Sequence, residues 1–315
     1  MNAPEWQADI IITDEIARTC IENQFKNLLP IISFNNIGEG WDNKVYLVNQ
    51  QIIFRFPRRK IAIDLIEKEN HLLNIIHSNI QTPLKIPYPI YFGKPSENYP
   101  HPFHGYEIIH GKSACHANLT ERDRLNSLNV LTDYLINLHQ LNKQKAESLG
   151  IRSQPFTRTN IPKVIESFEQ RIKEIVDNQF IHIDLKIFNQ ELKLIEQIKL
   201  NDNDLSVVHG DIYCRHLIFD NNQLSGIIDW GDAGIGHKSV DLSVIWSFYP
   251  KNVHKHFFDL YGQVDEDTWQ YARILGLYSD IAIMLYGFDI NDKFLVKESV
   301  DSIVRINNNL ILNPR

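Results

Sequence analysis

The stretch from Ser206 to Ile245 constrains the fold of this 315-residue chain more than any other part of it. It holds three short apolar runs, at residues 207–208, 217–219 and 224–228. The turn-forming residues Asp220-Asn221-Asn222 separate the second run from the third. Short apolar runs with such a turn between them are typical of buried strands joined in a hairpin. We therefore expect a short β-hairpin here, with polar residues in the loops at the strand ends.

Three side chains able to support chemistry lie in those loops. Asp211 and His216 fall between the first two runs, and Asp229 follows the third. We expect the two carboxylates to lie at the ends of adjacent strands and to face one cavity. Two carboxylates beside an imidazole can hold a divalent cation and leave one carboxylate for proton transfer.

The spacing of these residues carries a family resemblance. His209-Gly210-Asp211 matches the H-x-D of the catalytic loop in protein-kinase-like phosphotransferases, and Asp229-Trp230-Gly231 matches their D-x-G segment. The combination of H-G-D with I-D-W-G-D resembles the aminoglycoside and macrolide phosphotransferase family. The resemblance is dense over residues 206–247, and the FRFPRR strand and the distal WSFYP and YGFDI segments extend it.

The resemblance implies a role for each residue. Asp211 would orient a substrate hydroxyl, or accept its proton, during attack on the γ-phosphorus of ATP or GTP. Asp229 and His216 would hold the Mg²⁺ that bridges the nucleotide phosphates. The family usually has Asn where this chain has His216, and imidazole suits magnesium less well than an amide oxygen does. Asp241 would support the catalytic loop from the helix that follows.

Residues 31–57 predict strand, glycine-bearing loop, strand, tight turn and strand, which suits an antiparallel sheet that covers a nucleotide. Gly38 and Gly40 lie in the predicted loop, where glycine lets the backbone approach a phosphate. Gly-x-Gly alone is a weak signal, because it more often marks only a turn.

Arg55 stands where kinase-like folds place the strand lysine that grips the nucleotide phosphates. Arginine offers a planar fork in place of a point charge. The next helix, predicted over 61–77, carries Glu69, which we expect to pair with Arg55 as the lysine–glutamate pair does in this fold. Glu67 is the alternative partner.

The resemblance predicts a bilobal α+β protein-kinase-like fold, with a small antiparallel-sheet N-lobe and a larger, mainly helical C-lobe. The nucleotide-binding N-lobe would span 1–108 and the C-lobe 109–315. A strand over 103–109 would join them, with backbone groups from Glu107 to Ile109 reading the purine edge. Helices expected over 161–180 and 183–200 stand where the family builds its acceptor site.

Composition narrows the cellular setting and the partners. No apolar run approaches the length that spans a bilayer, the N-terminus lacks a secretory pattern, and three scattered cysteines suit a reducing compartment. We therefore expect a cytoplasmic protein without a membrane partner, as a monomer or homodimer. The net charge of −7 argues against nucleic acid as a partner. Residues 1–105 carry 10 basic and 11 acidic groups, so the remainder holds −6, which suits a cationic small-molecule substrate.

These observations predict a small-molecule O-phosphotransferase, an antibiotic kinase for aminoglycosides or macrolides. Three alternatives stay open. The same scaffold phosphorylates other metabolites of the choline, homoserine or sugar type. A catalytically silent nucleotide-binding regulator would also fit, given the residues at 55 and 216. A metal-dependent hydrolase could use the same acidic residues, but it would leave Arg55 and Glu69 without a purpose.

Overall fold

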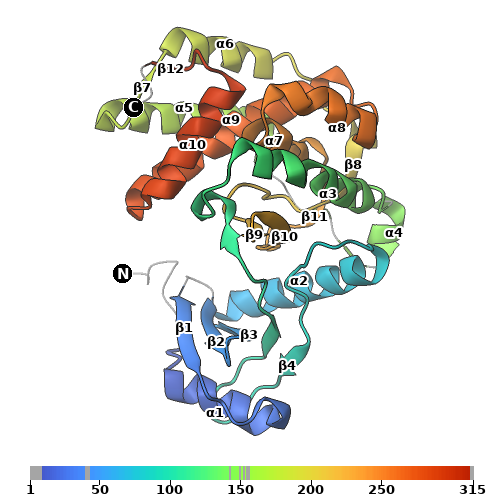
Figure 1. Cartoon of the computed structure of the whole chain (residues 1–315), viewed down its shortest axis with the longest axis vertical. Coiled ribbons are helices and arrows are strands. Elements are labelled where there is room, and N and C mark those ends of the chain that lie inside the picture. Colours follow the sequence, from blue (N-terminus) through green and yellow to red (C-terminus); the bar gives the residue numbers. More distant parts are fainter. Residues whose placement is uncertain are drawn as a thin grey trace. The chain divides into compact units, whose positions relative to one another are not determined.

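The computed structural model describes residues 9–39, 43–141, 143–148, 150–151, 153 and 157–312. Contacts within the chain divide it into two compact units (Figure 1). The first holds the residues up to Asn79 together with Ile86–Ile109, and the second holds Ile80–Lys85 together with the residues from His110 onward. Ile80–Lys85 belongs to the second unit because the backbone of Lys85 hydrogen-bonds to that of Ser225 and Ile227.

An antiparallel sheet forms most of the first unit, with strand order β1-β2-β3-β5-β4, as the sequence predicts. Its strands are β1 (Phe34–Glu39), β2 (Asn43–Val48), β3 (Ile52–Pro57), β4 (Tyr91–Gly93) and β5 (Phe103–Glu107). Asn49 and Gln50 join β2 to β3 with φ of 51° and 56°, the values of a tight hairpin turn. The prediction that Gly38 lies in a loop is wrong, since it lies within β1, at an irregularity in the pairing with β2.

The first unit also carries the helices α1 (Asp14–Gln24) and α2 (Lys60–Asn79). Oγ1 of Thr13 accepts a hydrogen bond from the N–H of Ile16, so Thr13 caps α1. Side chains of α1 and of the sheet share one hydrophobic core. On α2, Leu65 is 45% exposed, whereas the neighbouring Ile66 is buried.

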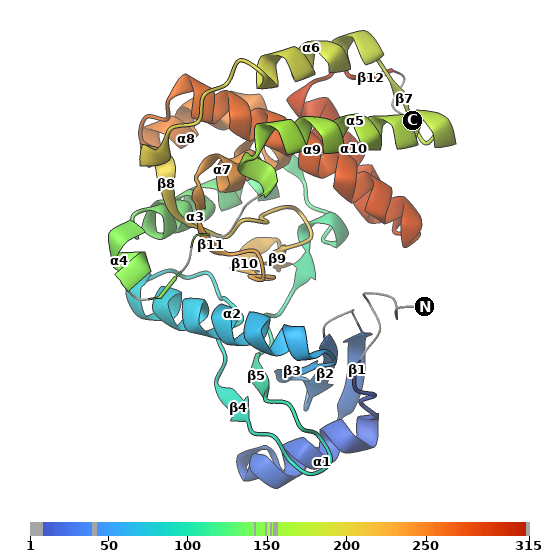
Figure 2. The ribbon, with the colours of Figure 1, turned by 180° about the vertical axis from the view of Figure 1, so that it is seen from behind.

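The second unit is mainly helical (Figure 2). Its α-helices are α3 (Glu121–His139), α4 (Lys143–Ser148), α5 (Ile161–Asn178), α6 (Leu185–Ile195), α7 (Ser239–Phe248), α8 (His254–Tyr261), α9 (Glu266–Asp289) and α10 (Lys293–Ile306). α7 is buried along its whole length and packs against α9 and α10, so these three helices form the centre of the unit. Within the described ranges, no helix combines the length and the apolar character needed to cross a bilayer.

Short 3₁₀ helices link these elements: η1 (Lys26–Leu28), η2 (Ala114–His116), η3 (Thr157–Thr159), η4 (Asp202–Asp204) and η5 (Lys251–Val253). The short strands of the second unit are β6 (Lys112–Ser113), β7 (His182–Ile183), β8 (Leu205–Val208), β9 (Leu217–Asp220), β10 (Gln223–Ile227), β11 (Gly234–His237) and β12 (Ile311–Leu312).

The predicted hairpin is β9–β10, which turns at Asn221 and Asn222 with positive φ. β9 also pairs with β6, whereas β8 pairs with β11 in a separate sheet. The expectation that Asp211 and Asp229 follow adjacent strands is therefore wrong. The strand before Asp211 is β8 and the strand before Asp229 is β10, so tertiary contacts must bring the two carboxylates together.

Candidate active site

The loop after β8 is held by a buried carboxylate, that of Asp241 in the first turn of α7. Oδ2 of Asp241 accepts the N–H of His209 and Oδ1 accepts the N–H of Gly210, both at 2.8 Å. Nε2 of His139 on α3 lies 3.2 Å from Oδ2. Gly210 has a φ of 87°, which side-chain-bearing residues rarely adopt, so this turn favours glycine. These contacts fix the backbone from which Asp211 projects.

His209 is fully buried and braces the same loop. The backbone N–H of Asp211 donates to Nδ1 of His209 at 3.2 Å, which leaves Nε2–H to donate to the carbonyl of Ile228 at 3.1 Å. Burial lowers the pKa of His209, despite the opposing charge of Asp241. The neutral imidazole therefore connects the residue before Asp229 to the loop that carries Asp211.

His216 links the two predicted carboxylates. Its Nδ1 lies 2.8 Å from the backbone oxygen of Asp211 and 3.5 Å from Oδ2 of that residue, while Nε2 lies 3.3 Å from Oδ2 of Asp229. Burial lowers the pKa of His216, but the hydrogen bond to Asp229 and the charges of both carboxylates outweigh it, so the net pKa lies above its ordinary value. His216 thus contacts both Asp211 and Asp229, and the structure brings the three predicted residues together.

The donors present fit magnesium at Asp229 better than at His216. The carboxylate of Asp229 is 62% exposed and supplies the hard oxygen atoms that Mg²⁺ prefers, whereas His216 supplies nitrogen. No group of three or more His, Cys, Asp and Glu side chains is placed to hold a metal within the part of the chain that the structure describes. Mg²⁺ in nucleotide sites is commonly held by one or two carboxylates together with phosphates and water. The residues present fit an ion of that kind.

A cavity of about 720 Å³ opens beside these residues. Its lining comprises Asp211, His216, Asp229, Ser113, Tyr213, Arg215, Ile218, Ile228 and Tyr286. The guanidinium of Arg215 lies 5.2 Å from the ring centroid of Tyr286 on α9. Neither residue was predicted from the sequence. Arg215 precedes His216 in the chain, which is a usable signal, whereas only the packing of α9 reveals Tyr286.

Arg158 on η3 is a further residue that the sequence analysis missed. Nη2 of its guanidinium donates to Oδ1 of Asp211 at 2.6 Å, and Nη1 donates to the carbonyl of Gly210. Arg158 lies far from the H-G-D motif along the chain, in a polar loop segment, and no pattern in the sequence marks it. The structure therefore adds a cation to the predicted set of carboxylates and imidazole.

The predicted ion pair of the first unit is present. Nη1 of Arg55 on β3 lies 2.8 Å and 2.9 Å from the two carboxylate oxygens of Glu69 on α2. Glu69 is buried, with 5% of its side chain exposed, while Arg55 retains 20%. The alternative partner, Glu67, is exposed. Glu69 therefore fixes the position of Arg55 from below the sheet surface.

The other predicted nucleotide-binding residues also fall in the first unit or outside the described residues. A Cβ added to Gly38 would meet no atom within 4 Å, so the fold itself does not require glycine there. Gly40 lies outside the described residues. Glu107 ends β5 with an exposed side chain, and the side chain of Ile109, at the end of this unit, is buried.

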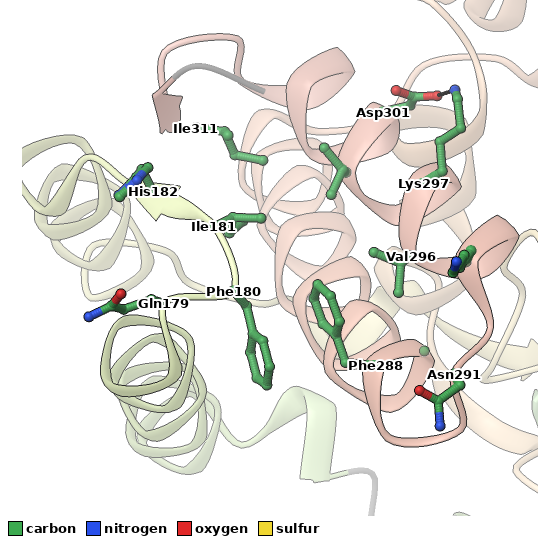
Figure 3. A pocket seen from close by; sticks show the side chains of 13 residues that line it. Gln179, Phe180, Ile181, His182, Phe288, Asn291, Val296, Lys297, Asp301 and Ile311 are labelled. Carbon is green, nitrogen blue, oxygen red and sulfur yellow. Dashed lines mark hydrogen bonds and ion pairs between the residues drawn. The ribbon is translucent and has the colours of Figure 1, made fainter. Parts of the chain in front are cut away.

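A second cavity, of about 610 Å³, lies in the second unit between the end of α5 and the helices α9 and α10 (Figure 3). The rings of Phe180 and Phe288 stack along it, with centroids 4.3 Å apart. None of the predicted site residues lines this cavity. Phe288 follows Tyr286 on α9 by two residues, so α9 contributes side chains to both cavities.

Comparison with known families assigns the chain. A family model described as "Phosphotransferase enzyme family" matches residues 33–276. The match covers most of the chain and includes the Arg55–Glu69 pair and the Asp211, His216 and Asp229 cluster. The chain belongs to this family.

Curated relatives of this phosphotransferase family match parts of the chain. Aminoglycoside 3'-phosphotransferase of Escherichia coli is 37% identical over 62 residues, which are 19% of this chain and 23% of that protein. Aminoglycoside 3'-phosphotransferase of Niallia circulans is 27% identical over 174 residues, 52% of this chain and 63% of that protein. The matched parts therefore span less than two thirds of these relatives.

Solved structures match nearly the whole length. The GDP and kanamycin complex of APH(2")-IIia has a TM-score of 0.65 at 23% identity, covering 93% of this chain and 98% of that one. Macrolide 2'-phosphotransferase MphH from Brachybacterium faecium has a TM-score of 0.55 at 13% identity, covering 94% and 99%. These likenesses confirm the predicted α+β protein-kinase-like fold.

Proposed function

We propose that this chain is a nucleotide-dependent O-phosphotransferase that moves the γ-phosphate of ATP or GTP to a hydroxyl of a small molecule. One observation carries the proposal. Asp211 and Asp229 line one cavity and are joined by His216, and the buried Asp241 fixes the backbone of the loop that carries Asp211. Phosphoryl transfer depends on positioning and charge stabilisation more than on covalent chemistry of the protein. This set of residues supplies both.

In this proposal the residues after 108 carry the catalytic chemistry. Asp211 orients the acceptor hydroxyl and receives its proton as the oxygen attacks the γ-phosphorus. Asp229 would hold Mg²⁺, with His216 beside it, and the ion would neutralise charge on the phosphates. His216 holds the backbone carbonyl of Asp211 through Nδ1, so it ties the catalytic residue to the metal-binding residue.

Residues 1–108 carry nucleotide binding in this proposal. Arg55, fixed by Glu69, donates to the phosphates, and Gly38 with Gly40 lets the backbone approach them. The open space around Gly38 supports this role. Backbone groups between Glu107 and Ile109 read the purine edge.

Aminoglycosides and macrolides are the first candidate acceptors. Kanamycin and gentamicin are bound in solved structures of this fold, and a macrolide phosphotransferase shares it. The negative charge of the chain after residue 105 suits an amine-bearing acceptor. Residues 179–182, which join α5 to α6, line the second cavity, and this supports a role for that segment in acceptor choice. Choline, homoserine and sugars are the alternative acceptors.

Release of ADP or GDP in the presence of Mg²⁺, across a panel of these compounds, tests the proposal. We expect one compound class to stimulate release, and we expect Asp211→Asn to lower turnover by at least about 10³-fold while nucleotide affinity changes little. Asp220→Asn, an exposed carboxylate at the end of β9, serves as the matched control and should retain full activity. Full turnover by Asp211→Asn would contradict the proposed role. Nucleotide binding with no turnover on any acceptor would favour the regulator.

A further inference from the structure

We propose that Arg158 is a positioning residue, which fixes the carboxylate of Asp211 in the orientation that receives the acceptor hydroxyl. This inference rests on the function proposed above, because it assigns a role within the same site. It starts from the observation that Oδ1 of Asp211 is already occupied by a guanidinium of the chain itself.

Two consecutive residues of the catalytic loop receive hydrogen bonds from Arg158. Nη2 donates to Oδ1 of Asp211 at 2.6 Å, and Nη1 donates to the carbonyl of Gly210. A guanidinium is a rigid planar fork, so two hydrogen bonds from it fix an orientation as well as supplying charge. Nη2 also lies 3.7 Å from Oδ2 of Asp232. Oδ1 of Asp211 is therefore held in a fixed position relative to the backbone of the catalytic loop.

The backbone of Arg158 is itself tied to the core. The hydroxyl of Tyr271 on α9 donates to the carbonyl of Arg158 at 2.7 Å, and Tyr271 is fully buried. Burial and the nearby Tyr278 raise the pKa of the Tyr271 hydroxyl, which keeps it a proton donor. The backbone of Arg158 is therefore held by α9, one of the three central helices of the unit. Its own side chain remains 24% exposed.

These contacts leave one carboxylate oxygen for the acceptor. Oδ2 of Asp211 lies 3.5 Å from Nδ1 of His216, whose shorter contact, of 2.8 Å, is with the backbone oxygen of Asp211. The side chain of Asp211 is 26% exposed and lines the cavity. Without Arg158, the carboxylate is free to rotate about its terminal torsion, which has a broad preference. Oδ2 of Asp211 would then face the acceptor hydroxyl for only part of the time.

A purely structural role for Arg158 is the competing explanation, in which it only anchors η3 to the catalytic loop. The two roles differ in what the loss of Arg158 changes. A positioning role affects the chemical step and leaves nucleotide binding intact, because Arg158 hydrogen-bonds to Asp211 and Gly210, on the loop that acts on the acceptor in the proposed function. A structural role lowers thermal stability and activity together.

The experiment compares Arg158→Gln and Arg158→Lys with Arg171→Gln. Arg171 lies on α5, 4.1 Å from the ring centroid of Tyr278, and donates to the carbonyl of that residue on α9. The control therefore removes a guanidinium from the same part of the unit without touching Asp211. We measure kcat, the KM for nucleotide and the melting temperature of each variant, using ATP, GTP and the best acceptor of the panel.

We expect Arg158→Gln to lower kcat by about 10²-fold, the size of effect that a displaced catalytic group causes, with the nucleotide KM within about twofold of wild type. Arg158→Lys should restore part of kcat, since it keeps the charge and one donor. Arg171→Gln should keep kcat near the wild-type value. For Arg158→Ala, added guanidinium ion should restore turnover in a saturable way.

A wild-type kcat in Arg158→Gln would overturn the positioning role. A loss of kcat that accompanies an equal loss of thermal stability would also overturn it, if neither Arg158→Lys nor added guanidinium ion restores turnover. Wild-type protein without turnover on any acceptor contradicts the proposed function, and this role falls with it. If the wild-type protein turns over an acceptor and Arg158→Gln does so at the same rate, only the role of Arg158 is contradicted. The two failures are therefore distinguishable.

Discussion

At the scale of single residues, the guanidinium of Arg55 is held in place by a buried partner, Glu69. Fixing the side chain of Arg55 costs free energy, because a long side chain loses conformational freedom when it is held in one position. Glu69, with only 5% of its side chain exposed, provides two carboxylate oxygens for that purpose. The pair therefore presents a guanidinium in one defined position.

Replacing Arg55 tests its part in nucleotide binding. We expect Arg55→Ala to lower kcat/KM for the nucleotide by about 10²-fold, since it removes charge-assisted hydrogen bonds to the phosphates, each worth about 1.5–3 kcal/mol. Arg55→Lys should lose less, because it keeps the charge but not the fork. Steady-state kinetics with varied nucleotide measures both. Arg18→Ala, which removes an exposed i,i+4 ion pair on α1, is the control. An unchanged nucleotide KM in Arg55→Ala would exclude Arg55 from the phosphate site.

At the scale of elements, the catalytic loop depends on the first turn of α7. Both carboxylate oxygens of Asp241 accept backbone N–H groups of the loop, and His139 on α3 approaches one of them. Burial by itself would raise the pKa of Asp241. The hydrogen bond and charge of His139 and the hydrogen bond from the amide of Gly210 outweigh burial, so the pKa lies below its ordinary value.

This shift predicts how stability depends on pH. A carboxyl group whose pKa is lower in the folded state adds stability above its unfolded pKa of about 3.9, and that stability is lost as the pH falls through the folded pKa. We expect Asp241→Asn to lower the free energy of unfolding at pH 7 by about 3 kcal/mol, because its amide group would oppose one backbone N–H. Below about pH 4 the difference from wild type should shrink.

Urea unfolding at pH 7 and at acidic pH measures this difference. Asp259→Asn, an exposed carboxylate on α8, is the control and should leave the free energy of unfolding nearly unchanged. An Asp241→Asn variant as stable as wild type at pH 7 would show that the loop does not rely on this carboxylate.

At the scale of the whole molecule, nucleotide and metal should stabilise the chain together. A ligand that binds only the folded state, at 100 times its Kd, adds about 2.7 kcal/mol. We expect ATP or GTP to raise the melting temperature more in MgCl₂ than in EDTA, and Asp229→Asn to remove that difference. Thermal unfolding of both proteins in both buffers measures it. A nucleotide shift that EDTA leaves unchanged would argue against a metal site at Asp229.

The sequence by itself determined the elements and the identity of most of the cluster. The alternation of apolar residues and turns placed the antiparallel sheet and the β9–β10 hairpin, because these patterns report local geometry. The H-G-D and D-W-G motifs indicated Asp211, His216 and Asp229, which the structure brings together. The resemblance to kinase-like folds also predicted the pair of Glu69 with Arg55, which the structure contains.

Only the tertiary structure decided how these residues meet. β8 and β10 belong to different sheets, so strand adjacency does not join the carboxylates; His209 and His216 do, through contacts that no local pattern encodes. Arg158 and Tyr286 reach the site from η3 and α9, which are distant along the chain. The physical reason is that hydrophobic periodicity marks which face of an element is buried but not which partner covers it. Long-range packing decides which partner covers each face, and it also places the guanidinium of Arg158 beside Asp211.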